Sequence, residues 1–259
     1  MCDTKNTMDN IDLSLSADRI RQLTLEFYSH FACIDLTTVK SGVSFVCSSA
    51  RDEILAGFGC NYTIYILDLG SGNAVAAYSP KHRGFFDSLG EVTSEEMIEA
   101  AQKQFRLRKM RLLIFDGEKV SNFDGARLLE PADYSHYESF FRETEPDADP
   151  EGWLKEYFCE KTEQSLFTGC FDDGQLAAVC DAPDVPYMQG KVQHTGIMTL
   201  EERRGQGFGK RAAALSAKHL IETGVCPQWE SDFGNVASYR LALSIGYRDF
   251  GTAYILEEY

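Results

Sequence analysis

The stretch from Gly196 to Arg211 constrains the fold more than any other part of the chain. It reads GIMTLEERRGQGFGKR, an apolar segment that runs into glycines at 205, 207 and 209. An alanine-rich helix is predicted directly after it, at about 207–223. Glycines let backbone N–H groups approach a ligand closely, and the start of a helix leaves its first N–H groups unpaired. A strand, a glycine loop and a helix start in this order therefore predict a cradle for a diphosphate.

Two common phosphate loops do not fit this stretch. A Walker A loop needs Ser or Thr after Gly-Lys and a glycine at 204, but Arg211 follows Lys210 and position 204 is arginine. A dinucleotide fingerprint would need a glycine at 210 or 212. The remaining pattern, R-x-x-G-x-G, is met by Arg204 to Gly209.

This segment resembles motif A of the GCN5-related N-acetyltransferase (GNAT) superfamily. Asn235, ahead of a short predicted helix that ends in Ile245-Gly246-Tyr247, resembles the second motif of the family. Residues 126–133 resemble its opening strand and helix, so the resemblance covers about half of the chain. The whole chain is similar to a bacterial subgroup with a long N-terminal domain before the GNAT core.

The predicted elements give an α+β chain in two parts. The first part has helices at 16–33 and 94–105, and strands at 43–47, 62–69, 74–78 and 110–115. The turn-rich segment 116–125 is the predicted boundary. We therefore expect an N-terminal α+β domain at 1–120, and at 126–259 a GNAT-type mixed, mostly antiparallel sheet flanked by helices.

The resemblance also implies which residues bind acetyl-CoA. The backbone of Met198, Thr199 and Leu200 would pair with the pantetheine arm, like an added strand. The pyrophosphate would lie on the loop made by Arg204, Gly205, Gln206, Gly207, Phe208, Gly209 and Lys210. Asn235 would bind the pantetheine, although a helix N-cap explains this residue equally well. No metal is expected.

The family reaction is direct acyl transfer to an amine, which must first lose a proton because its pKa is ~10.4. Many members carry a tyrosine seven residues after the motif asparagine, but this chain has Ala242. Tyr239 is therefore one candidate proton donor beside Cys226, Tyr254 and water. Glu230 is the candidate base; Asp232 on the same strand and His194 are alternatives, and a solvated carboxylate would explain Glu230 without any catalytic role.

Charge and composition limit the partners. The chain has 25 Lys and Arg against 40 Asp and Glu, for a net charge of −15, which argues against nucleic acid. The same charge suits a cationic acceptor, or simply solubility. Eight cysteines without a C-x-x-C pair, no secretion signal and no apolar span predict a cytoplasmic protein away from membranes. The remaining candidate partner is a second copy of the chain in a homodimer.

The sequence thus predicts an N-acyltransferase that moves an acetyl group from acetyl-CoA to a primary amine of a small molecule or peptide. One alternative is a non-catalytic sensor of acyl-CoA on the same fold, which the missing tyrosine at 242 favours. Another is a transferase with a different acyl donor.

Overall fold

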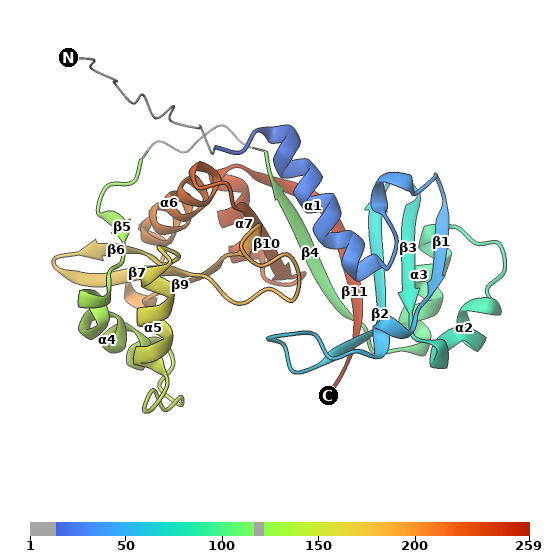
Figure 1. Ribbon diagram of the computed structural model, residues 1–259, viewed down its shortest axis with the longest axis horizontal. Helices are drawn as coiled ribbons and strands as arrows, with labels where there is room; N and C mark the ends of the chain where they lie inside the picture. The colour runs from blue at the N-terminus through green and yellow to red at the C-terminus, as the bar shows by residue number, and fades with distance from the viewer. Residues whose placement is uncertain (1–13, 117–121) are drawn as a thin grey trace, which may run out of the picture.

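The computed structural model of the protein describes residues 14–116 and 122–259, and its strands form two sheets (Figure 1). The larger sheet has the strand order β1-β3-β2-β11-β4-β10-β8, and the smaller one the order β5-β6-β7-β9. The elements up to residue 116 are α1 (Ala17–Ala32), β1 (Val43–Cys47), β2 (Asn61–Gly70), β3 (Asn73–Tyr78), α2 (Arg83–Asp87), α3 (Ser94–Gln104) and β4 (Arg108–Phe115). Those from residue 122 on are β5 (Ala126–Leu128), α4 (Tyr134–Thr144), α5 (Leu154–Glu163), β6 (Thr168–Asp172), β7 (Gln175–Asp181), β8 (Val192–His194), β9 (Gly196–Thr199), α6 (Phe208–Glu222), β10 (Cys226–Asp232), α7 (Val236–Ile245) and β11 (Tyr247–Glu258).

The predicted fold class is confirmed: this is an α+β protein whose mostly antiparallel sheets are flanked by helices. Local sequence accounts for most elements. In α1, for example, the Ser16 hydroxyl caps the first turn and Ile20, Leu23 and Phe27 are buried on one face. Helix α2 was not predicted. Its Phe86 stacks on Tyr78 of β3, with the ring centroids 4.1 Å apart, in a core shared with α3.

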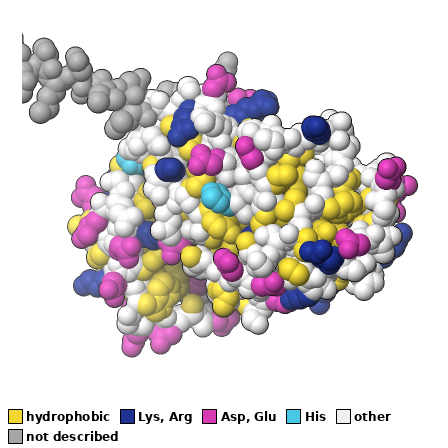
Figure 2. Space-filling view, turned by 45° about the vertical axis from the view of Figure 1, so that its right-hand side comes forward, with side chains coloured by type: hydrophobic (Ala, Val, Ile, Leu, Met, Phe, Trp, Pro, Cys, Tyr) yellow, Lys and Arg dark blue, Asp and Glu magenta, His cyan; other side chains and the backbone are white. Residues whose placement is uncertain are grey.

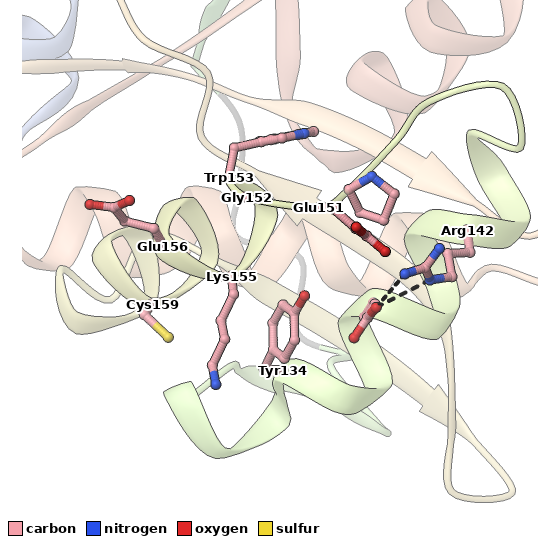
Figure 3. A pocket seen from close by; sticks show the side chains of 10 residues that line it. Tyr134, Arg142, Glu151, Gly152, Trp153, Lys155, Glu156 and Cys159 are labelled. Atoms are coloured by element: carbon pink, nitrogen blue, oxygen red, sulfur yellow. Dashed lines mark hydrogen bonds and ion pairs between the residues drawn. The ribbon is translucent and has the colours of Figure 1, made fainter.

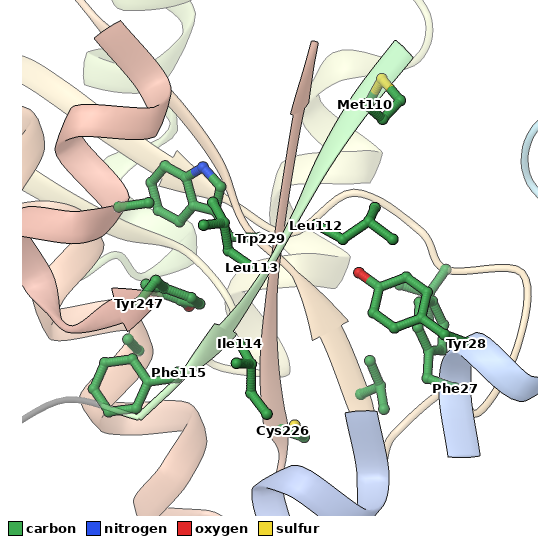
Figure 4. Packing of buried hydrophobic residues seen from close by; sticks show 14 of the residues in the cluster. Phe27, Tyr28, Met110, Leu112, Leu113, Ile114, Phe115, Cys226, Trp229 and Tyr247 are labelled. Atoms are coloured by element: carbon green, nitrogen blue, oxygen red, sulfur yellow. The ribbon is translucent and has the colours of Figure 1, made fainter. Parts of the chain in front are cut away.

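The seven-stranded sheet contains strands from both sides of the predicted domain boundary at 116–125. β4 lies between β10 and β11 and is antiparallel to both, so that Leu113 faces Trp229 on one side and Asp249 on the other. Figure 4 shows its side chains alternating, with Leu112 toward Tyr28 and Leu113 toward Trp229. Leu112 and Leu113 are fully buried. The division into units 1–120 and 126–259 stays a prediction, and part of its boundary, 117–121, lies outside the described residues.

The sequence predicts a single strand over residues 192–200. The structure has two strands there, β8 and β9, and the two sheets separate at the break between them. β8 pairs in parallel with β10 as far as His194, whereas β9 pairs antiparallel with β7. Between them, the backbone N–H and the hydroxyl of Thr195 both donate to the carbonyl of Gln228, at 3.2 and 3.1 Å. Beyond this point β9 and β10 belong to different sheets, and their facing edges are not paired with each other.

Helices cover both faces of the larger sheet beside this opening. Trp229 of β10 donates from Nε1 to Ser238 of α7 at 3.0 Å, while the next residue, Glu230, accepts from Tyr28 of α1. α6 and α7 therefore cover one face, and α1 the opposite face of the larger sheet. α4 and α5 pack on the smaller sheet through Val179 and Leu200. No helix in the described part of the chain is long and apolar enough to cross a membrane.

Candidate active site

The glycine loop has the geometry of an anion site. α6 begins at Phe208, and its N-cap is Gly207, whose φ of 85° is a left-handed value that glycine adopts without strain. Within the described chain no side chain caps this helix start, so its first N–H groups remain available. A Cβ on Gly209 would lie 2.8 Å from the Thr199 hydroxyl, which shows how closely α6 approaches β9. The loop therefore fits a phosphate group.

The loop opens into a cleft of about 710 Å³ between β9, the start of α6 and the start of α7. It contains most of the residues that the sequence predicts for acetyl-CoA. Its lining comprises Ile197, Met198, Thr199, Arg203, Arg204, Gly205, Gly207, Phe208, Gly209, Lys210, Asn235, Ala237, Ser238 and Leu241. Of the predicted set, Leu200 and Gln206 lie outside this lining.

Leu200 has no free backbone group to offer a ligand. Its N–H donates to the Ala177 carbonyl of β7, and its own carbonyl accepts from the Arg203 N–H. Alternate residues of a strand direct their peptide groups to opposite edges, so Met198 also faces β7. Ile197 and Thr199 then present theirs to the cleft. The backbone groups that are free to pair with a ligand are thus those of Ile197 and Thr199, rather than those of all three predicted residues, 198–200.

The positive charge at the loop is also more restricted than the sequence suggests. Arg204 and Lys210 line the cleft, and the Arg204 Nε approaches the Thr199 carbonyl at 3.4 Å. Arg203, although it lines the cleft, has its Nε 3.1 Å from an oxygen of Asp172. Arg211 folds over the Phe208 ring, 4.6 Å from its centroid. Of these four cations, Arg204 and Lys210 line the cleft without a carboxylate partner among the described residues.

Asn235 has the structural role that the sequence allowed, and it also lines the cleft. Its side-chain oxygen accepts the Ser238 N–H at 3.0 Å, which caps α7. Its position on the cleft wall leaves the side-chain NH₂ group available to a ligand. A role in pantetheine binding stays a prediction.

Glu230 lies beside the opening between the sheets, two residues beyond Gln228. Its Oε1 accepts the Tyr28 hydroxyl at 3.0 Å and lies 3.5 Å from His194 Nε2, without the alignment of a hydrogen bond. Burial, and next the charge of Glu230, raise the pKa of Tyr28 well above its usual value, so this tyrosine stays protonated. The structure thus brings together two candidate bases from distant parts of the sequence. Asp232 is not among them, because it pairs with Arg108 at 2.8 Å.

The three candidate proton donors do not line the cleft. The Tyr239 hydroxyl donates to Asp249 at 2.9 Å. Cys226 is fully buried beneath α1, and burial raises the pKa of its thiol to about 11. Tyr254 packs in the separate core under α2 and α3. Tyr239 therefore has no contact that marks it as an acid for the leaving thiolate.

Asp181 is a site residue that the sequence did not reveal. It ends β7 and is paired with Gly196, and a Cβ on Gly196 would collide with the Asp181 carboxylate. Burial raises the pKa of this carboxyl to about 6. In the sequence it is only an acid at the end of a strand, and the register that sets it at the opening is a tertiary feature.

The family model that describes acetyltransferases of the GNAT family matches residues 132–247, the segment that contains the cleft. These residues are a GNAT acetyltransferase domain. The family implies acyl transfer from an acyl-CoA. That the glycine loop binds the cofactor stays a prediction. The chain has no match among curated proteins.

The chain is also similar to several solved structures of GNAT proteins. One from Colwellia psychrerythraea is 17% identical, with a TM-score of 0.48, over 59% of this chain and 56% of that chain. One from Sphaerobacter thermophilus is 15% identical, with a TM-score of 0.48, over 64% of this chain and 57% of that one. The acetyltransferase AAC(6')-Iy, solved with a CoA-containing bisubstrate analogue, is 18% identical, with a TM-score of 0.41, over 48% and 90%. The match spans little more than half of the first two proteins.

Proposed function

We propose that the protein transfers an acetyl group from acetyl-CoA to a primary amine. One observation carries the proposal: the glycine loop, the open edge of β9 and the opening beside Glu230 lie along one path. The loop would hold the pyrophosphate through N–H groups at the start of α6, with Arg204 and Lys210 adding charge. The peptide groups of Ile197 and Thr199 would pair with the pantetheine amides.

The transfer step needs only a positioned amine and a place for its proton. The amine nitrogen forms a bond to the thioester carbonyl carbon, the carbon–sulfur bond breaks, and CoA leaves as a thiolate. Before the attack, Glu230 removes one proton from the acceptor ammonium, directly or through a water, while Tyr28 holds this carboxylate in place. The nitrogen gives its second proton to solvent as the tetrahedral intermediate collapses to the amide. Because no tyrosine or cysteine among the candidates lines the cleft, the thiolate takes its proton from solvent.

The surface supports a cationic acceptor. The face drawn in Figure 2 carries Asp and Glu side chains across its whole extent, interspersed with Lys and Arg. The net charge of −15 attracts an ammonium compound and repels a polyanion outside the loop.

Glu230→Gln tests this function directly. Acetyl-CoA-dependent thiol release should require an amine, and the variant should lower kcat about 10²- to 10³-fold, because a positioned base contributes about that much. The KM for acetyl-CoA should change less than threefold. Asp232→Asn is the matched control and should stay within threefold of the wild type. Full activity in the Glu230 variant would exclude this residue as the base.

Tyr239→Phe should cost less than tenfold in turnover, because its hydroxyl is bonded to Asp249 and not directed into the cleft. Steady-state kinetics at saturating acetyl-CoA measure this. A loss above about 10²-fold, with unchanged acetyl-CoA affinity, would identify Tyr239 as the acid instead.

An acyl-CoA sensor is the second candidate function, favoured by Ala242 and by a cleft lining without tyrosine or cysteine. The same assay separates the two. Tight acetyl-CoA binding without thiol release for any amine would indicate the sensor.

A further inference from the structure

A second pocket lies on the opposite side of β9 from the cofactor cleft. Its volume is about 350 Å³, within the range of small-molecule sites. Met198 lines both the pocket and the cleft, so the two spaces adjoin across this strand. Asp181 also lines the pocket, beside Gly196 at the opening between the sheets. The pocket therefore gives the amine acceptor a route to the thioester end of acetyl-CoA bound in the cleft.

The pocket wall is aromatic. Tyr137, Phe140 and Phe141 come from α4, and Trp153 from the residue before α5. Phe141 and Trp153 meet edge to face, with ring centroids 5.5 Å apart. Trp153 is 45% exposed and Met198 37%, so the wall leaves large apolar side chains uncovered. Such a surface inside a pocket favours an apolar ligand group.

The charge of the pocket is negative. The lining includes Asp181 and Glu145 but no Lys or Arg. The backbone of Asp181 itself only partly offsets the effect of burial on the pKa of its carboxyl group. Lys161 is the cation that acts on Asp181, but its ammonium group is bound to Asp184 at 2.6 Å.

Tyr137 and Tyr157 are two further titratable groups close to Asp181. Burial, and after it the charge of Asp181, raise the pKa values of Tyr137 and Tyr157, so both hydroxyls stay neutral. Because Glu145, the other carboxylate of the lining, is exposed, Asp181 is the more enclosed group that can pair with a cation in the pocket.

The hollow on the other side of Trp153 differs in kind. Figure 3 shows Tyr134 and Lys155 on the far side of the start of α5 from the Trp153 indole. That hollow, of about 570 Å³, carries charges of both signs, and its Arg142 is bound to Glu138 at 2.7 Å. Its lining combines two cations with three glutamates, so it does not share the purely negative charge of the pocket.

We infer that the acceptor is a primary amine carried on an aromatic or branched apolar group, its ammonium held by Asp181 and its apolar group packed against Trp153, Phe141 and Met198. This inference rests on the proposed acetyl transfer. Aromatic faces also attract an ammonium group, which adds to the charge pair. Glu230 then removes a proton from this ammonium, so that the neutral amine can attack the thioester. Asp181 is a binding residue in this scheme, so its loss should raise KM more than it lowers kcat.

The test compares amines that differ in the group they carry. With the full chain and acetyl-CoA, kcat/KM for 2-phenylethylamine and 3-methylbutylamine should exceed that for spermidine or ethylamine at least 30-fold. A short peptide with N-terminal phenylalanine tells a peptide acceptor from a small molecule. Equal rates for all amines would overturn the inference and leave the acetyl transfer intact.

Two variants locate the effect. Trp153→Ala should raise the KM for 2-phenylethylamine about tenfold and leave that for acetyl-CoA unchanged, whereas Leu243→Ala, at another exposed apolar residue, should change neither. Asp181→Asn should raise the same KM at least 30-fold, with Asp173→Asn in an exposed turn as control. An unchanged KM in both pocket variants would overturn the inference.

The pH dependence gives a separate measure. Because the carboxylate must be ionised to hold an ammonium, the affinity of the wild type for 2-phenylethylamine should fall as the pH drops through about 6. The Asp181→Asn variant should lack this fall. If no amine is acetylated, calorimetric binding of 2-phenylethylamine and spermidine to wild type and Trp153→Ala still decides the matter. No preference for 2-phenylethylamine would then overturn the pocket assignment.

Discussion

Gly207→Glu should abolish CoA binding, with a loss of more than 10²-fold in affinity. Gly207 has a φ of 85°, where any side chain strains the backbone by roughly 1–2 kcal/mol. A carboxylate at this position would also place a negative charge at the N-terminus of α6, the proposed site of the CoA phosphates. Isothermal calorimetry with CoA measures the effect.

Two further variants separate the causes of that loss. Gly207→Ala should weaken binding only about tenfold, because it adds the backbone strain without the charge. Gly84→Glu introduces the same side chain in α2, where φ is not positive and a Cβ meets open space, and should bind CoA like the wild type. A Gly207→Glu protein that binds CoA with wild-type affinity would show that the cofactor site is elsewhere.

The fragment 122–259 should not fold by itself, although it contains the whole GNAT domain. It lacks β4, which fills the space between β10 and β11. The loss would expose the partners of Leu112, Leu113 and Ile114, each of which contributes roughly 1.5–3 kcal/mol when buried. Three such losses match the whole stability of a typical domain, about 5–15 kcal/mol. Circular dichroism and thermal unfolding should therefore show no cooperative transition.

Co-expression with residues 14–116 is the complementary experiment. The second fragment supplies β4 and α1, so the two should purify as one complex with a cooperative transition. A soluble 122–259 fragment that unfolds cooperatively by itself would show instead that the N-terminal part is a separate domain, as the sequence predicts.

The glycine loop, two hairpins and the amphipathic helix α1 could be predicted from the sequence, because they depend on local chain geometry. Gly205 and Gly207 predict the loop because a left-handed φ at a helix start nearly requires glycine. At Gly209 the reason for glycine is the close approach of α6 to Thr199. The same holds for the hairpins after β2 and β6, and for the amphipathic face of α1. The cofactor cleft could be anticipated because most of its lining falls within one continuous stretch.

Contacts between segments far apart in the sequence are seen only in the tertiary structure. The place of β4 between β10 and β11, the break at Thr195, the contact of Glu230 with Tyr28 and the position of Asp181 beside Gly196 depend on strand pairing. Each joins residues that no local pattern relates. Pairing and burial are properties of the whole packed chain, because a strand can bond to any partner whose edge and apolar face fit. The proposed acceptor side of the site is built from such contacts, and it could therefore be proposed only from the fold.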